Sequence, residues 1–490
     1  MRAWNRERRC FGAEATCNRL SAFRKSGPGF RSELHAGEVG QGRRREASLR
    51  VMNLRAGIYT LCKYPATKQL EQLYRRVVAF RPAQGTAYIQ SLVNHATRHV
   101  AYYREALDRD SDWTEVPTLT KGLIRKNFER LQSDGPRSSD WLTTSSGGST
   151  GQPVTFVQDN QYREWSAATE LFFYRRLIRV DFGCVPAVVL WGSERDLFGQ
   201  SESLKHRVRN WLLNTTLLNS FRMTDRDMAR FVETINRRKP ALIRGYAGSL
   251  YELARFAKAR GLRIHRPIKI YSSAETLRPF MRQLIEEVFG CKVHDFYGSR
   301  EVGPMAGECE KGRMHLFSFN NLVEVVGTDD RPVRPGQEGR VLVTTLHNFA
   351  MPLIRYEIGD TAVVGEPCDC GLALPTLARV SGRVTDHFLT REGALVHGEY
   401  FTHLFYFRDW VREFQVLQRD VDLVEVYYVP AGAIHEPDIT EINEKIRLVM
   451  GPFCRVEWHE VGEIPRTPQG KLLFTRSLVT GEPPDKEAIY

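Results

Sequence analysis

The sequence lacks a long hydrophobic run. Its most apolar stretches, such as VPAVVLWG at 185–192, fall well short of the roughly 18 apolar residues that a membrane-spanning helix needs. Only nine of the 490 residues are cysteine, they are unevenly spaced, and the first residues contain no apolar core of a signal peptide. These absences exclude a membrane span and a disulfide framework, and they predict a cytoplasmic protein in a reducing compartment.

Excess charge is also scarce outside the first 51 residues. The chain has a net charge of +12, but residues 1–51 contain 12 Arg or Lys against five Glu and so carry seven of these charges. The remainder is close to balanced, which predicts no nucleic-acid partner. We interpret residues 1–51 as a disordered tail or as an over-extended start, with the folded chain opening near Met52. Binding of RNA or a membrane through GRRRE at 42–46 is the less favoured alternative.

Periodicity in the rest of the chain predicts an α/β fold. Helical spacing dominates first, and from 185 to about 345 short apolar runs alternate with helical stretches, which is typical of a mainly parallel sheet flanked by helices. Beyond residue 386 a strand at 423–429, a helix with Asp438 as its N-cap and a strand from 454 predict a small, mobile α+β domain. The expected organisation is a leader at 1–51, a large domain at 52–385 and a small domain at 386–490.

The segment SSGGSTGQPVTF at 145–156 is crowded with glycine and small hydroxyl residues. A flexible linker is one interpretation, although structured sequence flanks the segment on both sides. A Walker A loop is excluded, because Gln152 and Pro153 follow Gly151 where that motif needs Lys and a hydroxyl residue. The remaining interpretation is a loop whose backbone amides and hydroxyls surround phosphate oxygens.

Four further motifs follow in order: DFYGSREVG at 295–303, PLIRYEIGD at 352–360, VSGRVTD at 380–386 and IPRTPQGK at 464–471. Together with the glycine-rich segment they resemble the adenylate-forming superfamily, over residues 55 to 480. Within it the chain is most similar to the phenylacetate–CoA ligase branch, including its relatives found with capsular-polysaccharide genes.

The resemblance implies a role for each motif. The glycine-rich loop would hold the departing pyrophosphate, Tyr297 would stack on adenine next to Gly298 in the nucleotide site, and Ala274 and Glu275 would line the adenine edge. Glu301 would bind Mg²⁺, Asp360 would bind the ribose hydroxyls, and the catalytic residues would be Lys471, Glu301 and Arg383. The expected loop residues are Ser146, Gly147, Gly148, Ser149, Thr150 and Gly151. The alternatives are a core tyrosine for Tyr297, a turn-capping acid for Asp360 and a solvated lysine for Lys471.

A second group of residues suggests a metal site. Cys309, His315, Cys368 and Cys370 form a Cys₃His set with the soft ligands that zinc prefers. The Cys-x-Cys spacing is tighter than usual, so unrelated buried or surface cysteines are the alternative. The resemblance favours the metal, because some members of the branch carry a zinc on this kind of pattern. With four protein ligands the zinc would be structural.

Three functional hypotheses follow. The first is a carboxylic acid–CoA ligase that uses ATP, Mg²⁺ and CoA and proceeds through an acyl-adenylate. The second passes the acyl or nucleotidyl group to a non-CoA acceptor, such as an amine, a sugar or a carrier, in polysaccharide biosynthesis. The third is a non-catalytic interaction protein of the same fold, which the intact motifs argue against. The identity of the acid and the oligomeric state are not predicted, but the segment RGYAGSLY at 244–251 and Tyr271 are expected to line the acid pocket.

Overall fold

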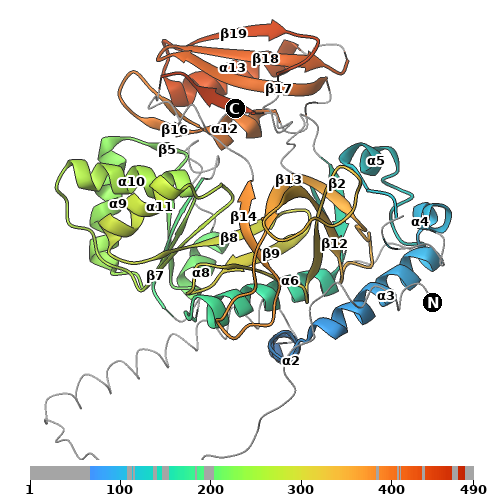
Figure 1. Ribbon diagram of the computed structural model, residues 1–490. Coiled ribbons are helices and arrows are strands. Elements are labelled where there is room, and N and C mark those ends of the chain that lie inside the picture. Colours follow the sequence, from blue (N-terminus) through green and yellow to red (C-terminus); the bar gives the residue numbers. More distant parts are fainter. Residues whose placement is uncertain are drawn as a thin grey trace, which may run out of the picture.

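The computed structural model (Figure 1) describes most of the chain beyond the leader. The described residues are 67–107, 113, 116–135, 141–145, 154–181, 185–192, 204–381, 386–405, 408, 410–432, 436–465 and 473–479. The leader predicted at 1–51 lies outside them. A long sheet with helices packed around it forms the lower part of the view, and a smaller sheet with its own helices lies above it.

One half of the long sheet is parallel. Its strands are β3 (Ala187–Trp191), β4 (Thr215–Asn219), β6 (Leu242–Gly245), β7 (Lys269–Ser273) and β8 (Val293–Ser299), in the spatial order β4-β3-β6-β7-β8. The crossover helices α8 (Leu204–Leu212), α9 (Asp225–Arg238), α10 (Ala247–Ala259) and α11 (Pro279–Phe289) connect them. These are the alternating strands and helices that the hydrophobic pattern predicts.

The other half of the sheet is antiparallel. It contains β9 (Gly303–Glu308), β10 (Met314–Leu316), β11 (Asn321–Val326), β12 (Glu338–Thr345), β13 (Tyr356–Val364) and β14 (Thr376–Ser381). The predicted parallel pairing therefore stops at β8. Consecutive strands beyond β8 are joined by turns and loops, and a parallel pair would need a crossover connection of a dozen or more residues.

Helices of the N-terminal part cover the sheet. They are α2 (Thr67–Val78), α3 (Pro82–His99), α4 (Ala101–Ala106), α5 (Lys121–Lys126) and α6 (Asn160–Phe172), and α6 continues into a π-helical turn, η3 (Phe173–Leu177). Asp159 caps α6 by accepting a hydrogen bond from the Tyr162 amide at 2.7 Å. Among the described residues no helix is both long and apolar enough to cross a membrane.

The smaller sheet has the order β19-β18-β17-β20. Its strands are β17 (Val411–Asp420), β18 (Leu423–Pro430), β19 (Arg455–Glu460) and β20 (Thr475–Ser477), and α12 (Gly398–Leu404) and α13 (Glu436–Met450) pack with them. Asp438 does not cap α13, because the helix begins at Glu436. The Asp438 carboxylate instead accepts hydrogen bonds from Arg408 at 2.5 Å and from Trp410 at 2.8 Å.

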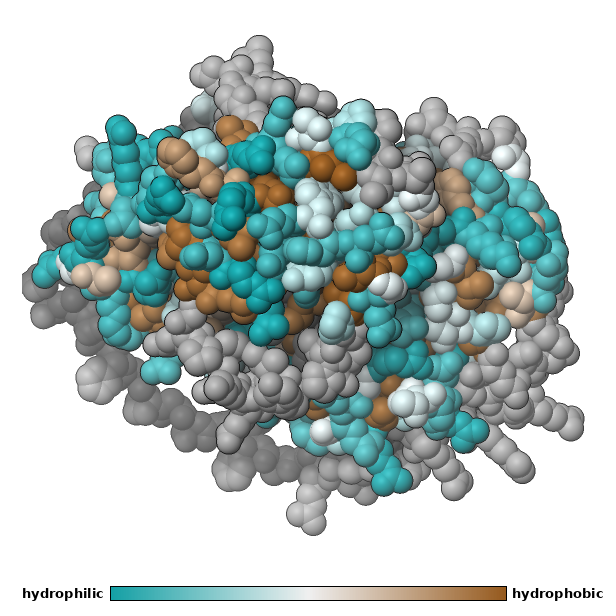
Figure 2. All heavy atoms as spheres, turned by 90° about the horizontal axis from the view of Figure 1, so that it is seen from above, coloured by the Kyte–Doolittle hydropathy of each residue, from teal (hydrophilic) through white to brown (hydrophobic). Residues whose placement is uncertain are grey.

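A short three-stranded sheet joins the two parts of the molecule. β16 (Leu395–His397) pairs with β15 (His387–Leu389) on one side and with β5 (Arg222–Met223) of the large part on the other. The core beneath the smaller sheet also includes Phe221 and Tyr246 of the large part. Seen from above, the face carrying the smaller sheet mixes hydrophilic and hydrophobic residues (Figure 2).

Candidate active site and metal centre

The glycine-rich segment is held between two paired strands. β1 (Leu142–Ser145) and β2 (Thr155–Gln158) are antiparallel, with Ser145 opposite Thr155. Residues Ser146 to Gly151 between them lie outside the described residues. At the end of β2, Gln158 donates a hydrogen bond of 2.9 Å to the Arg300 carbonyl. Gln158 pairs with Leu142 at the end of the hairpin away from the loop, so the hairpin that carries the predicted phosphate loop is tied to the turn that carries Glu301.

Glu301 lies in the turn between β8 and β9 and is only 3% exposed. Within the part of the chain that the structure describes, its carboxylate forms no ion pair and no hydrogen bond. A buried, unpaired carboxylate is costly unless another group balances its charge. A hard cation such as Mg²⁺, which usually takes only one or two protein carboxylates, fits this residue.

Tyr297 and Asp360 lie against each other. The Tyr297 hydroxyl donates a 2.7 Å hydrogen bond to the Asp360 carboxylate, which joins β8 to β13. A bulge in β13 places Asp360, because Ile358, Gly359 and Asp360 lie opposite the single residue Val341 of β12. Gly359 makes the bulge possible with a φ of +96°. Both side chains stay partly exposed, although the Tyr297 ring also packs against the hydrophobic core.

Gly298 lies in β8 directly after Tyr297, where the neighbouring strand leaves no room for a side chain. A Cβ added to Gly298 would lie 3.0 Å from the carbonyl oxygen of Gly303 and 3.4 Å from Pro304 on the paired strand. The backbone of β8 also shifts register between Tyr297 and Gly298. The glycine therefore allows β8 and β9 to approach closely next to Tyr297.

Ala274 and Glu275 follow β7, next to the end of β8. β7 and β8 are parallel, with Ser273 opposite Phe296, so the segments after them meet at one edge of the sheet, the usual ligand-binding edge of α/β proteins. Ala274 is exposed and has a φ of +72°. An L-residue in this left-handed region is strained, and such strain persists where the surroundings impose it.

The Glu275 carboxylate is already engaged by two groups. One oxygen accepts a 2.8 Å hydrogen bond from the Gly248 amide in the first turn of α10, where a helix favours negative charge. The other lies 2.9 Å from Nε2 of His397 in the C-terminal region. Burial opposes the charged form of His397, but Glu275 outweighs it and raises the pKa of the ring. The predicted contact of Glu275 with adenine stays a prediction.

The other two predicted catalytic residues, Arg383 and Lys471, lie outside the described residues, so the structure leaves their roles as predictions. Between them, the Asp386 carboxylate accepts a 3.0 Å hydrogen bond from the Ser477 amide. Burial raises the pKa of Asp386.

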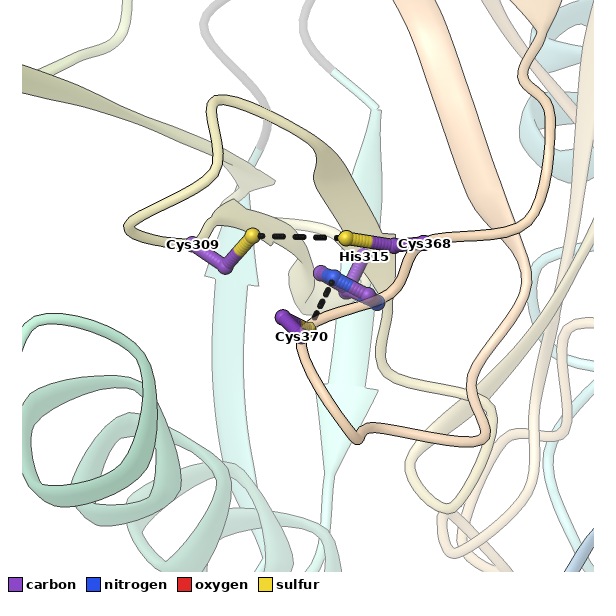
Figure 3. Close-up of side chains that lie close together, drawn as sticks. All are labelled: Cys309, His315, Cys368 and Cys370. Carbon is purple, nitrogen blue, oxygen red and sulfur yellow. Dashed lines mark hydrogen bonds between the residues drawn. The ribbon is translucent and has the colours of Figure 1, made fainter.

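The predicted metal ligands come together from two segments. Cys309 follows β9 and His315 lies in β10, whereas Cys368 and Cys370 belong to the loop between β13 and β14 (Figure 3). The Sγ atoms of Cys309 and Cys368 are 3.8 Å apart, and Cys370 Sγ is 3.2 Å from His315 Nε2. All four ligand atoms lie within 4.8 Å of one another.

This geometry suits a tetrahedral zinc ion. Zn–S bonds of about 2.3 Å place two thiolates of a tetrahedral site roughly 3.8 Å apart, which matches the observed separation of Cys309 and Cys368. Cys309 and His315 are buried. Burial lowers the pKa of His315, and the neutral ring is the form that binds a metal. Four protein ligands would leave no position for a reacting water.

Known proteins resemble the chain over most of its length. Residues 388–477 match the family described as the CapK C-terminal domain. Protein CapK of Staphylococcus aureus is 23% identical over 79% of this chain and 86% of its own, and phenylacetate-coenzyme A ligase of Thermus thermophilus is 25% identical over 78% and 93%. A solved structure of 2-hydroxyisobutyryl-CoA ligase is 20% identical, with a TM-score of 0.50, over 85% of this chain and 91% of that one.

The chain is therefore similar to adenylate-forming, phenylacetate–CoA ligase-like proteins and, in its C-terminal region, to CapK. The family prediction made from the five motifs is confirmed, and so is the predicted α/β fold with an additional C-terminal domain. The individual roles of the motif residues and the domain boundaries stay predictions.

Sequence reasoning missed two polar residues around this candidate site. Gln158 ties strand β2 to the Glu301 turn, and His397 contacts Glu275. Gln158 and His397 belong to no motif and act through contacts with distant segments, so the sequence carried no signal for them. Arg244 lies in the segment RGYAGSLY, which is where the acid was expected to bind.

Proposed function

We propose that this protein activates a carboxylic acid with ATP and then transfers the acyl group to the thiol of CoA. The observation that carries the proposal is the bond between Tyr297 and Asp360 at the edge of the sheet where Ala274 and the Glu301 turn also lie. A partly exposed aromatic ring beside a carboxylate offers a stacking surface for a base and an acceptor for ribose hydroxyls. Phenylacetate–CoA ligase as a relative supports the same reaction.

The reaction has two displacements. An oxygen of the acid attacks the α-phosphorus of ATP, the bond from that phosphorus to its bridging oxygen breaks, and pyrophosphate leaves. The CoA thiol then attacks the acyl carbon, AMP leaves and the thiol proton is released. Catalysis of the first step consists mainly of positioning and of balancing negative charge.

The residues divide this work. Gln158 ties the hairpin that carries the phosphate loop to the Glu301 turn, and Glu301 is the residue that would hold Mg²⁺, which screens phosphate charge when it is bound. Asp360 orients the ribose, with its own carboxylate oriented by the Tyr297 hydroxyl. Lys471 brings positive charge to the approaching carboxylate and phosphate.

The test is release of pyrophosphate from ATP against a panel of aryl, fatty, hydroxy and dicarboxylic acids. We expect acid-dependent release, and we expect Asp360→Ala to reduce kcat/KM by about 10²-fold, as is typical for a lost positioning contact. Asp225→Ala, which removes an exposed carboxylate paired with Arg260, is the matched control and should leave the rate unchanged. A chain that releases no pyrophosphate with any acid contradicts the proposal.

A second acceptor deserves the same assay, because the C-terminal region matches the CapK family. In that alternative the acyl or nucleotidyl group passes to an amine, a sugar or a carrier. Adding CoA should accelerate release of AMP if CoA is the acceptor. Pyrophosphate release with no response of AMP to CoA would favour the non-CoA acceptor.

We also propose that the Cys₃His cluster binds one structural zinc ion. The support is the set of four soft ligands with tetrahedral spacing, on two segments far apart in the chain. Metal analysis of freshly purified protein should give about one zinc per chain. Protein free of zinc and of any other transition metal would contradict this part of the proposal.

A further inference from the structure

A guanidinium group lies between two aromatic rings near the proposed site. Arg244 is the third residue of β6 and lies opposite Tyr271 of β7. Its Cζ atom is 4.7 Å from the centre of the Trp191 ring and 5.6 Å from that of Tyr271. The rings hold the planar cation by cation–π attraction and leave the directions around its edge for hydrogen bonds.

No carboxylate of the described residues lies within ion-pair distance of this cation, although Glu170 acts on it from farther away and the Tyr271 hydroxyl is a neighbouring acceptor. Among the residues that the structure describes, Arg244 forms no ion pair, and its Nε atom is buried without a hydrogen-bond partner. Cation–π contacts contribute about 0.5–2 kcal/mol, which is less than the cost of a buried, unpaired charge. A bound anion would offset the cost of keeping this guanidinium half-buried without an ion pair.

Two phenol groups extend the polar surface beside Arg244. The hydroxyls of Tyr271 and Tyr174 are 2.7 Å apart and hydrogen-bonded, and both rings are otherwise buried. Tyr174 belongs to the π-helical turn η3, a rare backbone form that is frequent at functional sites. Together they offer an anion fixed hydroxyl groups next to the guanidinium.

The location fits the acid rather than the nucleotide. Arg244 and Trp191 lie at or next to the carboxyl ends of β6 and β3, and Ala274 follows the adjacent strand β7. Ligands of α/β sheets bind along this edge. Arg244 is half-buried and keeps some accessible surface, so a small molecule bound at the sheet edge can reach it.

We propose that Arg244 selects an acid with a second anionic group, most simply a dicarboxylic acid. One carboxylate would be activated by ATP, and the other would bind the edge of the Arg244 guanidinium and the neighbouring phenol hydroxyls. Arg244 is then a specificity residue that does not touch the reacting atoms. This inference rests on the proposed function and specifies its substrate class.

The experiment compares matched acids. Pyrophosphate release is measured with unbranched and aromatic dicarboxylic acids and with the monomethyl ester of each, which keeps the size and removes one charge. We expect kcat/KM for the best dicarboxylic acid to exceed that of its monoester by 10²-fold or more. Arg244→Gln should reduce this ratio at least tenfold, Arg244→Lys should reduce it less, and the exposed control Arg237→Gln should not change it.

Each other outcome is decisive. A wild-type enzyme that prefers the monoesters overturns the inference even if Arg244→Gln does not fold, whereas acid-dependent pyrophosphate release of either kind still upholds the proposed function. If Arg244→Gln slows both acids of a pair equally, Arg244 binds the reacting carboxylate and the inference is wrong. If no acid releases pyrophosphate, calorimetric titration of the same dicarboxylic acids tests binding alone, and equal affinity of wild type and Arg244→Gln overturns the inference.

Discussion

The two halves of the long sheet use polar residues in opposite ways. In the parallel half, β3, β6, β7 and β8 end at one edge, and groups such as Arg244 and Tyr297 keep accessible surface there. In the antiparallel half, Cys309 and His315 turn inward and meet the loop after β13. Parallel pairing gathers residues from distant segments at an open edge, whereas a hairpin and a loop close around a small site. The open edge, which Asp360 of β13 also reaches through its bond to Tyr297, suits substrates, and the closed loop suits a structural ion.

Removing a cysteine should affect stability far more than chemistry. Cys368→Ser removes one ligand from the proposed zinc and leaves buried thiols without their cation. We expect a loss of about 4 kcal/mol in the free energy of unfolding, the size associated with loss of a metal, and near-normal specific activity in the fraction that stays folded. Denaturant unfolding and zinc analysis measure this, with Cys291→Ser, which lies outside the cluster, as control. If Cys368→Ser and Cys291→Ser are equally stable, the antiparallel half does not hold a structural ion as proposed.

Lys471 should give the opposite result. Lys471→Ala should lower formation of acyl-adenylate by 10²-fold or more, about 3 kcal/mol of transition-state stabilisation, and leave the free energy of unfolding unchanged. Supplied with pre-made acyl-adenylate, the variant should transfer the acyl group at nearly the wild-type rate, because the lysine serves the first step alone. Lys445→Ala, which removes an ammonium paired with Glu441 on α13, is the control. A similar loss in both half-reactions would mean that Lys471 does not act selectively in adenylation.

Asp295 offers a pH-dependent test of the parallel half. Burial and the neighbouring Glu308 raise its pKa from 3.8 to about 7, so the folded state keeps a proton that the unfolded state releases. The contribution of Asp295 to the free energy of unfolding therefore falls as the pH rises from about 4 to about 7, by at most about 1.4 kcal/mol per pH unit. Asp295→Asn should flatten this slope, and the exposed Asp225→Asn should not. Urea unfolding at pH 5 and pH 7 measures this slope for the wild type and both variants. If the free energy of unfolding of Asp295→Asn falls with pH as steeply as that of the wild type, the slope does not come from Asp295.

The smallest effect is expected from the leader. A protein that begins at Met52 should fold and form acyl-adenylate as well as the full chain, because the charge and composition of residues 1–51 predict no packed structure. Thermal unfolding and pyrophosphate release compare the two forms. A lower unfolding temperature or slower pyrophosphate release in the shortened protein would show that the first 51 residues contribute to the folded protein or to its activity.

Residues within a motif were easier to predict than contacts between motifs. Tyr297 and Asp360 were assigned to one nucleotide because each lies in a recognisable segment, and the structure brings them within hydrogen-bond distance. The contact between the Glu275 carboxylate and the His397 ring was not predictable from the sequence, because it depends on how β16 pairs with β5. The same holds for the strand directions: short apolar runs predict strands, but the antiparallel pairing after β8 follows from the connections. The unpaired state of Arg244 is visible only once its neighbours are known.

The contact between Glu275 and His397 limits how freely the C-terminal region could be exchanged among relatives. The CapK-type segment at 388–477 contains the imidazole, whereas the carboxylate belongs to the loop after β7. A hybrid chain that received this segment from a relative without histidine here would retain a buried carboxylate with one partner fewer. Such mispairing costs several kcal/mol at buried ion pairs. Compatibility between the two parts of a hybrid would therefore require the residues at 275 and 397 to be transplanted as a pair.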